Sequence, residues 1–172
     1  MIQQKMVELK KLIITQSSIV EKMIEKAMKG LINKDENLLK EVIDEDEALV
    51  NKNDILIDEK CVNILALFQP EAKDLRMTMM ISKMGVDLER IGDSAVNIAE
   101  SALYLISKPQ IKPYMDLPRM ADETIKMLND SINSFVNESE GLAATICKRD
   151  GIIDELRDQI IRELITYMLS TL

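Results

Sequence analysis

The chain has 172 residues, of which 47% are hydrophobic and 30% charged, so it can bury a core and its composition is not that of a disordered protein. Five glycines and four prolines supply too few turns for a sandwich or barrel, which argues against all-β folds. Histidine is absent, which excludes Ser-His-Asp catalysis, histidine-ligated zinc and Glu-x-x-His di-iron sites, and a net charge of −8 argues against nucleic acid as a partner.

Apolar residues spaced by three, four or seven positions predict a first helix that ends near Leu31. They are Met6, Leu9, Ile13, Val20, Ile24, Ala27 and Leu31. A polar break follows, in which Asp35 is placed to cap a second helix, predicted from about Glu36 to Phe68. Proline disfavours helix at the residue before it and suits the first turn of a helix, so Pro70 should end the second helix and begin a third.

The third predicted helix carries an apolar seam typical of an antiparallel bundle. Its members are Leu88, Ile91, Ala95, Ile98, Ala102 and Leu105. Three prolines in the tract 108–118 predict a linker. The sequence therefore predicts a first three-helix repeat over 1–107, a linker over 108–118 and a second unit over 119–172.

The second unit repeats the pattern of the first. The matching segments, displaced by 104 or 103 residues, are Leu31-Ile32-Asn33 with Phe135-Val136-Asn137, Leu38 with Leu142, and Glu47-x-x-Val50-Asn51 with Asp150-x-x-Ile153-Asp154. A steady displacement over some 20 positions indicates an internal duplication. The counterpart of the third helix would fall beyond Leu172, so we predict that the second repeat lacks it.

Three pairs of oxygen-bearing side chains lie four residues apart on the predicted helices: Glu89 with Asp93, Glu47 with Asn51, and Asp150 with Asp154. Residues at this spacing project from one helix face about one turn apart. Oxygen ligands without histidine or cysteine suit hard ions such as magnesium, calcium, manganese or ferric iron. Spacing alone also fits a solvated helix face, because acidic pairs are common in a chain with 30 acids.

A more specific pattern surrounds the third helix. Residues 65–76 read LALFQPEAKDLR and residues 87–100 read DLERIGDSAVNIAE. Both segments resemble the PhoU family, whose shared pattern is A-L-x-Q-P-x-A-x-D-L-R and then D-L-E-R-I-G-D-x-A-V-N-I-A-E. The resemblance covers the chain as five of the family's six helices, and the second E-R-I-G-D that the family carries on its last helix is missing.

The resemblance implies an all-α fold of two tandem antiparallel three-helix bundle repeats, the second without its third helix. It also implies metal clusters on E(D)-x-x-x-D motifs, with iron as the expected ion, and therefore a metal site at Glu89 and Asp93. The two other pairs are weaker metal-site candidates. Asn51 replaces a charged ligand, and the pair of Asp150 and Asp154 has no partner motif in this sequence.

The functional expectation from the resemblance is a cytoplasmic regulator of phosphate uptake that is not an enzyme and has no catalytic residue. It would link the phosphate ABC transporter to the phosphate-sensing histidine kinase and restrain phosphate-starvation genes when phosphate is plentiful. Two distant cysteines and the absence of a signal sequence agree with a cytoplasmic protein. No apolar run approaches the length of a membrane-spanning helix, which leaves only peripheral attachment to a membrane.

Two other functions remain open at this stage. One is a helical module for dimerisation that needs no ion. The other is a carboxylate-bridged metalloenzyme, which the lack of histidine disfavours because no proton shuttle is left near neutral pH. A repeat without its third helix would expose apolar stripes at about 25 cal/mol per Å², so we also expect a homodimer or higher homo-oligomer.

Overall fold

The computed structural model describes residues 2–170, and within that range it contains helices and no strand. The elements are α1 (Ile2–Asn33), α2 (Glu36–Glu41), the π-helical segment η1 (Val42–Asp46), α3 (Glu47–Phe68), α4 (Ala72–Ile106), α5 (Asp116–Val136) and α6 (Glu140–Ser170). Because α2, η1 and α3 follow one another without a break, they form the single second helix that the sequence predicts. The all-α prediction is confirmed.

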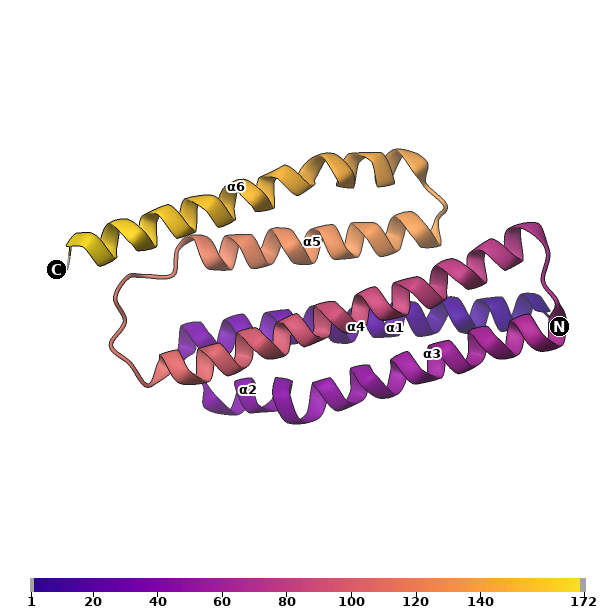
Figure 1. Ribbon diagram of the computed structural model, residues 1–172, viewed down its shortest axis with the longest axis horizontal. Coiled ribbons are helices and arrows are strands. Elements are labelled where there is room, and N and C mark those ends of the chain that lie inside the picture. The colour runs from indigo at the N-terminus through magenta and orange to yellow at the C-terminus, as the bar shows by residue number, and fades with distance from the viewer. Residues whose placement is uncertain (1, 171–172) are drawn as a thin grey trace.

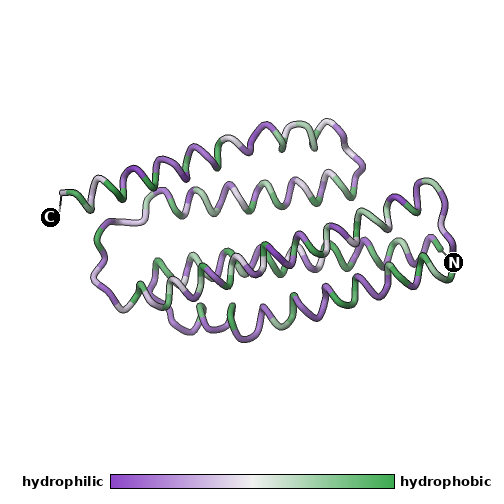
Figure 2. The backbone as a smooth tube through the Cα atoms, in the orientation of Figure 1, coloured by the Kyte–Doolittle hydropathy of each residue, from purple (hydrophilic) through white to green (hydrophobic). Residues whose placement is uncertain are grey.

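The helices lie side by side as an elongated bundle (Figure 1). Helix α1 packs against α3, α4 and α5, and α6 packs against α5 at the edge of the array. Each helix alternates hydrophobic with hydrophilic stretches along its length (Figure 2), as expected for helices that bury one stripe. Because α1 touches helices on more than one side, its stripe supplies much of the fully buried core, including Leu9, Ile13, Val20 and Met23.

The connection between α4 and α5 covers residues 107–115, which is shorter than the predicted linker. Pro118 lies in the first turn of α5 and not in the loop. A proline fits there because the backbone N–H that it lacks would have no partner within the helix. The division of the chain into domains remains a prediction.

The turn between the first two helices, here called the corner, has the same backbone arrangement in both repeats. Asp35 donates its backbone N–H to the carbonyl of Gly30 at 2.9 Å, and Ser139 donates to Ser134 at 2.9 Å, 104 residues later. The residue before each donor has a positive φ, 55° at Lys34 and 52° at Glu138. The side chains of Asp35 and Ser139 then accept from the backbone N–H of Leu38 and Leu142, respectively. The duplication read from the sequence is therefore present in the backbone.

The π-helical segment explains why the displacement between matching residues of the two repeats falls from 104 to 103. A π turn holds one residue more than an α turn. The first repeat has η1 between Leu38 and Glu47, whereas α6 runs as an unbroken α-helix between the equivalent residues, Leu142 and Asp150. One extra residue in the first repeat therefore shifts the register of everything after it.

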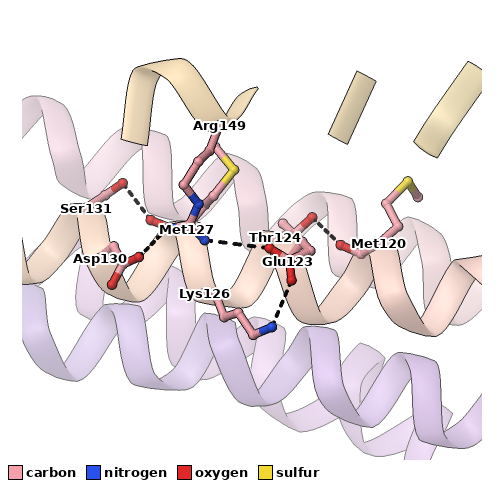
Figure 3. Close-up of polar contacts among 8 residues, drawn as sticks. All are labelled: Met120, Glu123, Thr124, Lys126, Met127, Asp130, Ser131 and Arg149. Carbon is pink, nitrogen blue, oxygen red and sulfur yellow. Dashed lines mark hydrogen bonds and ion pairs between the residues drawn. The ribbon is translucent and has the colours of Figure 1, made fainter. Parts of the chain in front are cut away.

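An ion pair between the first two helices also recurs, with its signs exchanged. In the first repeat Lys26 of α1 contacts Asp46 at 2.8 Å. At the equivalent positions of the second repeat, Asp130 of α5 pairs with Arg149 of α6 (Figure 3). Arg149 also lies 3.7 Å from Glu123. Each corner thus keeps one cross-helix ion pair, although the charged residues have changed places.

Helix α4 covers α3 in the first repeat, whereas no helix within residues 2–170 covers the equivalent face of the second repeat. The α3 residues buried in this way are Val50, Ile57, Cys61 and Ile64. Their counterparts on α6 are half-buried or exposed, and they are Ile153, Ile160, Leu164 and Tyr167. Within residues 2–170, α5 is the only helix that packs on α6.

Gly30 should resist substitution although it lies within a helix. A Cβ at this position would stand 2.5 Å from Cδ2 of Leu39, which is fully buried. Overpacking costs roughly 1–3 kcal/mol, whereas alanine gains about 1 kcal/mol of helix propensity over glycine. We predict that Gly30→Ala lowers the free energy of unfolding by about 1 kcal/mol in urea titrations.

The matched control is Gly151→Ala in α6. No atom lies within 4 Å of a Cβ built there, so this variant should gain about 1 kcal/mol. Equal stabilisation by both substitutions would show that the contact between Gly30 and Leu39 does not constrain the corner.

Candidate metal centre

The candidate site lies where α3 and α4 approach closely. A Cβ at Gly92 of α4 would stand 3.2 Å from Cγ1 of Val50, and a Cβ at Gly85 would stand 3.0 Å from Oδ1 of Asp54. Two glycines on one side of α4 therefore let the two helices come together. This contact runs antiparallel, so the acidic residues at the start of α3 meet those in the middle of α4.

Four carboxylates gather along this contact. Glu47 and Asp54 come from α3, and Glu89 and Asp93 come from α4. Glu47, Asp54 and Glu89 are half-buried, whereas Asp93 is exposed. Asn51, one turn beyond Glu47 on α3, is also exposed. The structure therefore brings the predicted Glu47 into the electrostatic neighbourhood of Glu89 and Asp93.

Burial and the acidic neighbourhood make Glu89 harder to ionise. Burial raises the pKa of its carboxyl group, and the negative charges of Asp93, Asp54 and Glu47 raise it further. Arg90 acts in the opposite direction on the pKa of Glu89. That guanidinium is itself 3.9 Å from Asp87 and points to an exposed surface. The four carboxylates thus carry more negative charge than their surroundings balance.

Asp54 is a member of this cluster that sequence reasoning missed. Burial raises the pKa of its carboxyl group, and the charge of Asp58 raises it further. One signal could have found it, because Asp54 follows Glu47 by seven residues and so occupies the same face of α3 two turns later. Pairs of acids four residues apart do not include this spacing of seven.

The donor chemistry of the cluster fits a hard cation, since all its ligands would be oxygen atoms. The side-chain geometry does not enclose one. Within residues 2–170, no three aspartate, glutamate, histidine or cysteine side chains are gathered closely enough to hold a metal ion. Metal binding at Glu89, Asp93, Glu47 and Asn51 therefore stays a prediction.

The third predicted pair lies elsewhere. Asp150 and Asp154 are exposed on α6, and Asp154 accepts a hydrogen bond from Arg157 at 2.8 Å. In the described part of the chain no acidic helix lies opposite them, because only α5 packs on α6. The structure does not join this pair to other acids as it joins Glu89 to Glu47.

Fold and site together define a class of protein: an elongated helical bundle whose first corner recurs 104 residues later, with acids concentrated between α3 and α4. The PhoU domain family matches residues 13–102 and 117–171, on either side of the connection between α4 and α5. The chain belongs to the PhoU family. This confirms the family that the sequence pattern indicates.

Individual relatives agree with this assignment. The chain is 40% identical over 163 residues to the phosphate-specific transport system accessory protein PhoU homolog of Aquifex aeolicus, covering 95% of this chain and 73% of that protein. It is 37% identical over 158 residues to the accessory protein PhoU of Escherichia coli, covering 92% of this chain and 65% of that protein. The crystal structure of PhoU from Pseudomonas aeruginosa superimposes with a TM-score of 0.92 at 31% identity, covering 99% of this chain and 81% of that one.

These comparisons do not confirm the predicted loss of a helix from the second repeat. The relatives align with nearly the whole of this chain, although the chain spans less than two thirds of the length of the Escherichia coli protein. None of the helices in residues 2–170 has the length and apolar character needed to cross a bilayer.

The raised pKa of Glu89 predicts how stability depends on pH. Because the folded protein holds the Glu89 proton more tightly than the unfolded chain does, the ionised carboxylate opposes folding at neutral pH. That penalty disappears as the pH falls through the raised folded-state pKa. In chelator, Glu89→Gln should therefore raise the free energy of unfolding at neutral pH by about 0.5 kcal/mol, the size of a like-charge repulsion at this spacing, and by less in acid.

Glu100→Gln provides the control, since Glu100 is exposed near the end of the same helix. Its unfolding free energy should match that of the parent protein at both pH values. A Glu89→Gln variant that is less stable at neutral pH would mean that the carboxylate makes a favourable contact.

Proposed function

We propose that the protein is a cytoplasmic regulator of phosphate uptake that is not an enzyme. It links the phosphate ABC transporter to the phosphate-sensing histidine kinase and holds back the phosphate-starvation response when phosphate is plentiful. Membership of the PhoU family supports the link to phosphate transport, because relatives are named phosphate-specific transport system accessory proteins. The acidic contact between α3 and α4 supports the mechanism.

In this mechanism a multivalent cation clamps α3 to α4. Glu89, Asp93 and Glu47 are the proposed ligands, with Asp54 near them and Asn51 as a neutral oxygen donor. The ion would draw the carboxylates inward and convert their repulsion into attraction. Iron is the expected ion from the family resemblance, and magnesium, manganese and calcium suit the same oxygen donors.

The proposed partner surface lies along the other side of α4. Met77, Met80 and Met84 line an open groove between α4, α5 and the start of α6, together with Phe135 and Ile146. Methionine side chains adapt their shape to different apolar partners. An adaptor that contacts a transporter subunit and a kinase needs such a surface, whereas nucleic acid would be repelled by the acidic chain.

We propose a weaker second metal site at Asp150 and Asp154, to be completed by acids from outside the described helices. We also propose homodimerisation, which the α6 face without a covering helix in residues 2–170 supports. Its exposed residues include Leu164 and Tyr167, which are 44% and 42% accessible. A second copy laid across this face would cover it, and light scattering would measure the resulting mass directly.

Two alternatives make different demands on the acidic cluster. A helical dimerisation module needs no ion, and its partner binding would be insensitive to chelator. A metalloenzyme needs a proton-transfer group besides its carboxylates, and the chain has no histidine to serve as one. The regulator is favoured because α3 and α4 hold unbalanced acids at a helix contact, where a cation can change how firmly the bundle is closed.

A pull-down distinguishes these functions. The immobilised protein should retain the transporter ATPase subunit and the cytoplasmic part of the kinase when phosphate and metal are present, and should lose them in chelator. Combined Glu89→Gln and Asp93→Asn substitutions should reduce retention at least as much as chelator does. The comparator, Asp150→Asn with Asp154→Asn, should have a smaller effect because no acidic helix within residues 2–170 faces that pair.

If chelator and the Glu89 and Asp93 substitutions both leave partner retention unchanged, the ion-independent module would be favoured. Failure to retain either partner with phosphate and metal present would contradict the proposed function.

A further inference from the structure

One end of the bundle carries an exposed apolar loop. Residues 107–115 connect α4 to α5 beyond the ends of these two helices, and α6 extends past the loop (Figure 1, at the end where the C-terminus lies). Ile111 is 70% exposed and Met115 is 76% exposed, and Tyr104 in the last turn of α4 is 67% exposed. Large apolar side chains are costly to leave in water, so a cluster of them on one exposed loop marks a contact surface.

The tyrosines are concentrated at the same end of the bundle as this loop. The chain has three tyrosines, and all of them lie there: Tyr104 at the end of α4, Tyr114 in the loop and Tyr167 near the end of α6. Tyrosine combines an apolar ring with a polar hydroxyl group. That combination is favoured at the boundary between lipid and water.

The charge of this loop is opposite to that of the rest of the molecule. The chain contains 30 acidic residues, yet residues 101–115 include none. They include Lys108, whose ammonium group lies 5.1 Å from the ring centre of Tyr104, and Lys112, which pairs with Glu163 of α6. Lys108 is therefore exposed beside the apolar side chains, in a position to meet negative charge.

The loop is tied to α6 by the ion pair between Lys112 and Glu163. It lies over an apolar pocket of about 420 Å³, which it lines together with Leu105, Leu117, Ile160 and Leu164. Pro109 and Pro113 restrict its backbone further. A loop held in one shape loses little conformational entropy on binding, so even a few inserted side chains can give measurable affinity.

The acidic cluster of α3 and α4 lies too far from the loop to repel an anionic surface there. Salt screens charges over about 8–10 Å at physiological ionic strength. Glu89 precedes the end of α4 by 17 residues, which places it about 25 Å from the loop at 1.5 Å per residue. The acidic cluster of α3 and α4 is therefore screened from a surface that touches the loop.

We propose that residues 104–115 form a membrane-docking tip that binds anionic lipid bilayers. Ile111 and Met115 insert among the lipid headgroups, Tyr104 sits at the interface, and Lys108 lies against the lipid phosphates. Two inserted side chains and one or two lysines give weak, reversible attachment that falls with rising salt. The tip acts independently of the metal ion and of the adaptor role proposed above.

Fluorescence tests the insertion directly because the chain has no tryptophan. Ile111→Trp should show a blue-shifted emission with vesicles of phosphatidylglycerol and phosphatidylcholine in equal parts, and no shift with phosphatidylcholine alone. Leu67→Trp is the matched control, since Leu67 is 74% exposed at the opposite end of the bundle. Its emission should not move with either vesicle.

Flotation with the same vesicles measures the affinity. Ile111→Ser combined with Met115→Ser should weaken vesicle binding by about tenfold or more, and Leu67→Ser should leave it unchanged. No flotation of the parent protein, an equal loss with Leu67→Ser, or a shift at position 67 equal to that at 111 would overturn the proposal. Binding only to vesicles that also carry a membrane protein would assign the tip to a protein partner and would overturn it as well.

Discussion

Repulsion between carboxylates at a close helix contact is the constraint on which the rest of the structure depends. Glu89 and Asp93 of α4 face a stretch of α3 that already carries Glu47 and Asp54, and burial together with the charges of these neighbours raises the pKa of Glu89. The helices nevertheless stay together, because apolar residues on their inner sides, such as Val50 and Ile57, are almost fully buried. Core packing thus holds the two helices together against their charge.

This opposition between core packing and carboxylate repulsion suits a bundle that is regulated better than one that is only stable. Gly92 costs about 1 kcal/mol of helix propensity, and the acids add a repulsion of a few tenths of a kcal/mol. Both features weaken the isolated protein, yet the glycine lets α3 and α4 approach and the acids supply oxygen ligands for the proposed cation. A bound ion would reverse the electrostatic term, so the firmness of the contact would follow the supply of that ion.

The second repeat shows which features belong to the duplicated unit and which to the site. The corner at Asp35 recurs at Ser139 with the same backbone hydrogen bond, and the ion pair of Lys26 with Asp46 recurs with exchanged charges. The π-helical segment does not recur, because α6 is α-helical throughout its described length. It directly precedes Glu47, so its extra residue sets the phase with which the acids of α3 face α4.

Much of the fold could be predicted from the sequence, because apolar periodicity, caps and prolines act locally. The second helix, the corner at Asp35 and the duplication all follow from such signals. The loop between α4 and α5 was predicted to be too long because Pro118 fits a helix start as well as a linker. Asp54 was missed for a different reason: its membership of the cluster depends on the approach of α4 at Gly85, a contact between segments distant in sequence.

The pairing of Glu89 with Asp93 could be predicted as a helix-face neighbour, whereas the contribution of Glu47 needed the antiparallel packing of α3 on α4. Asp150 and Asp154 have the same spacing and lack that packing within the described chain. Spacing along one helix therefore identifies candidate ligands, and the second helix decides which of them share a site.

Elemental analysis of the protein, purified without chelator and dialysed against iron, manganese or magnesium salts, tests the central claim most directly. The account predicts that metal remains bound in the parent protein, and that it is lost when Glu89→Gln is combined with Asp93→Asn. Parent protein that retains no metal from any of these salts, or a double variant that retains as much as the parent, would contradict it.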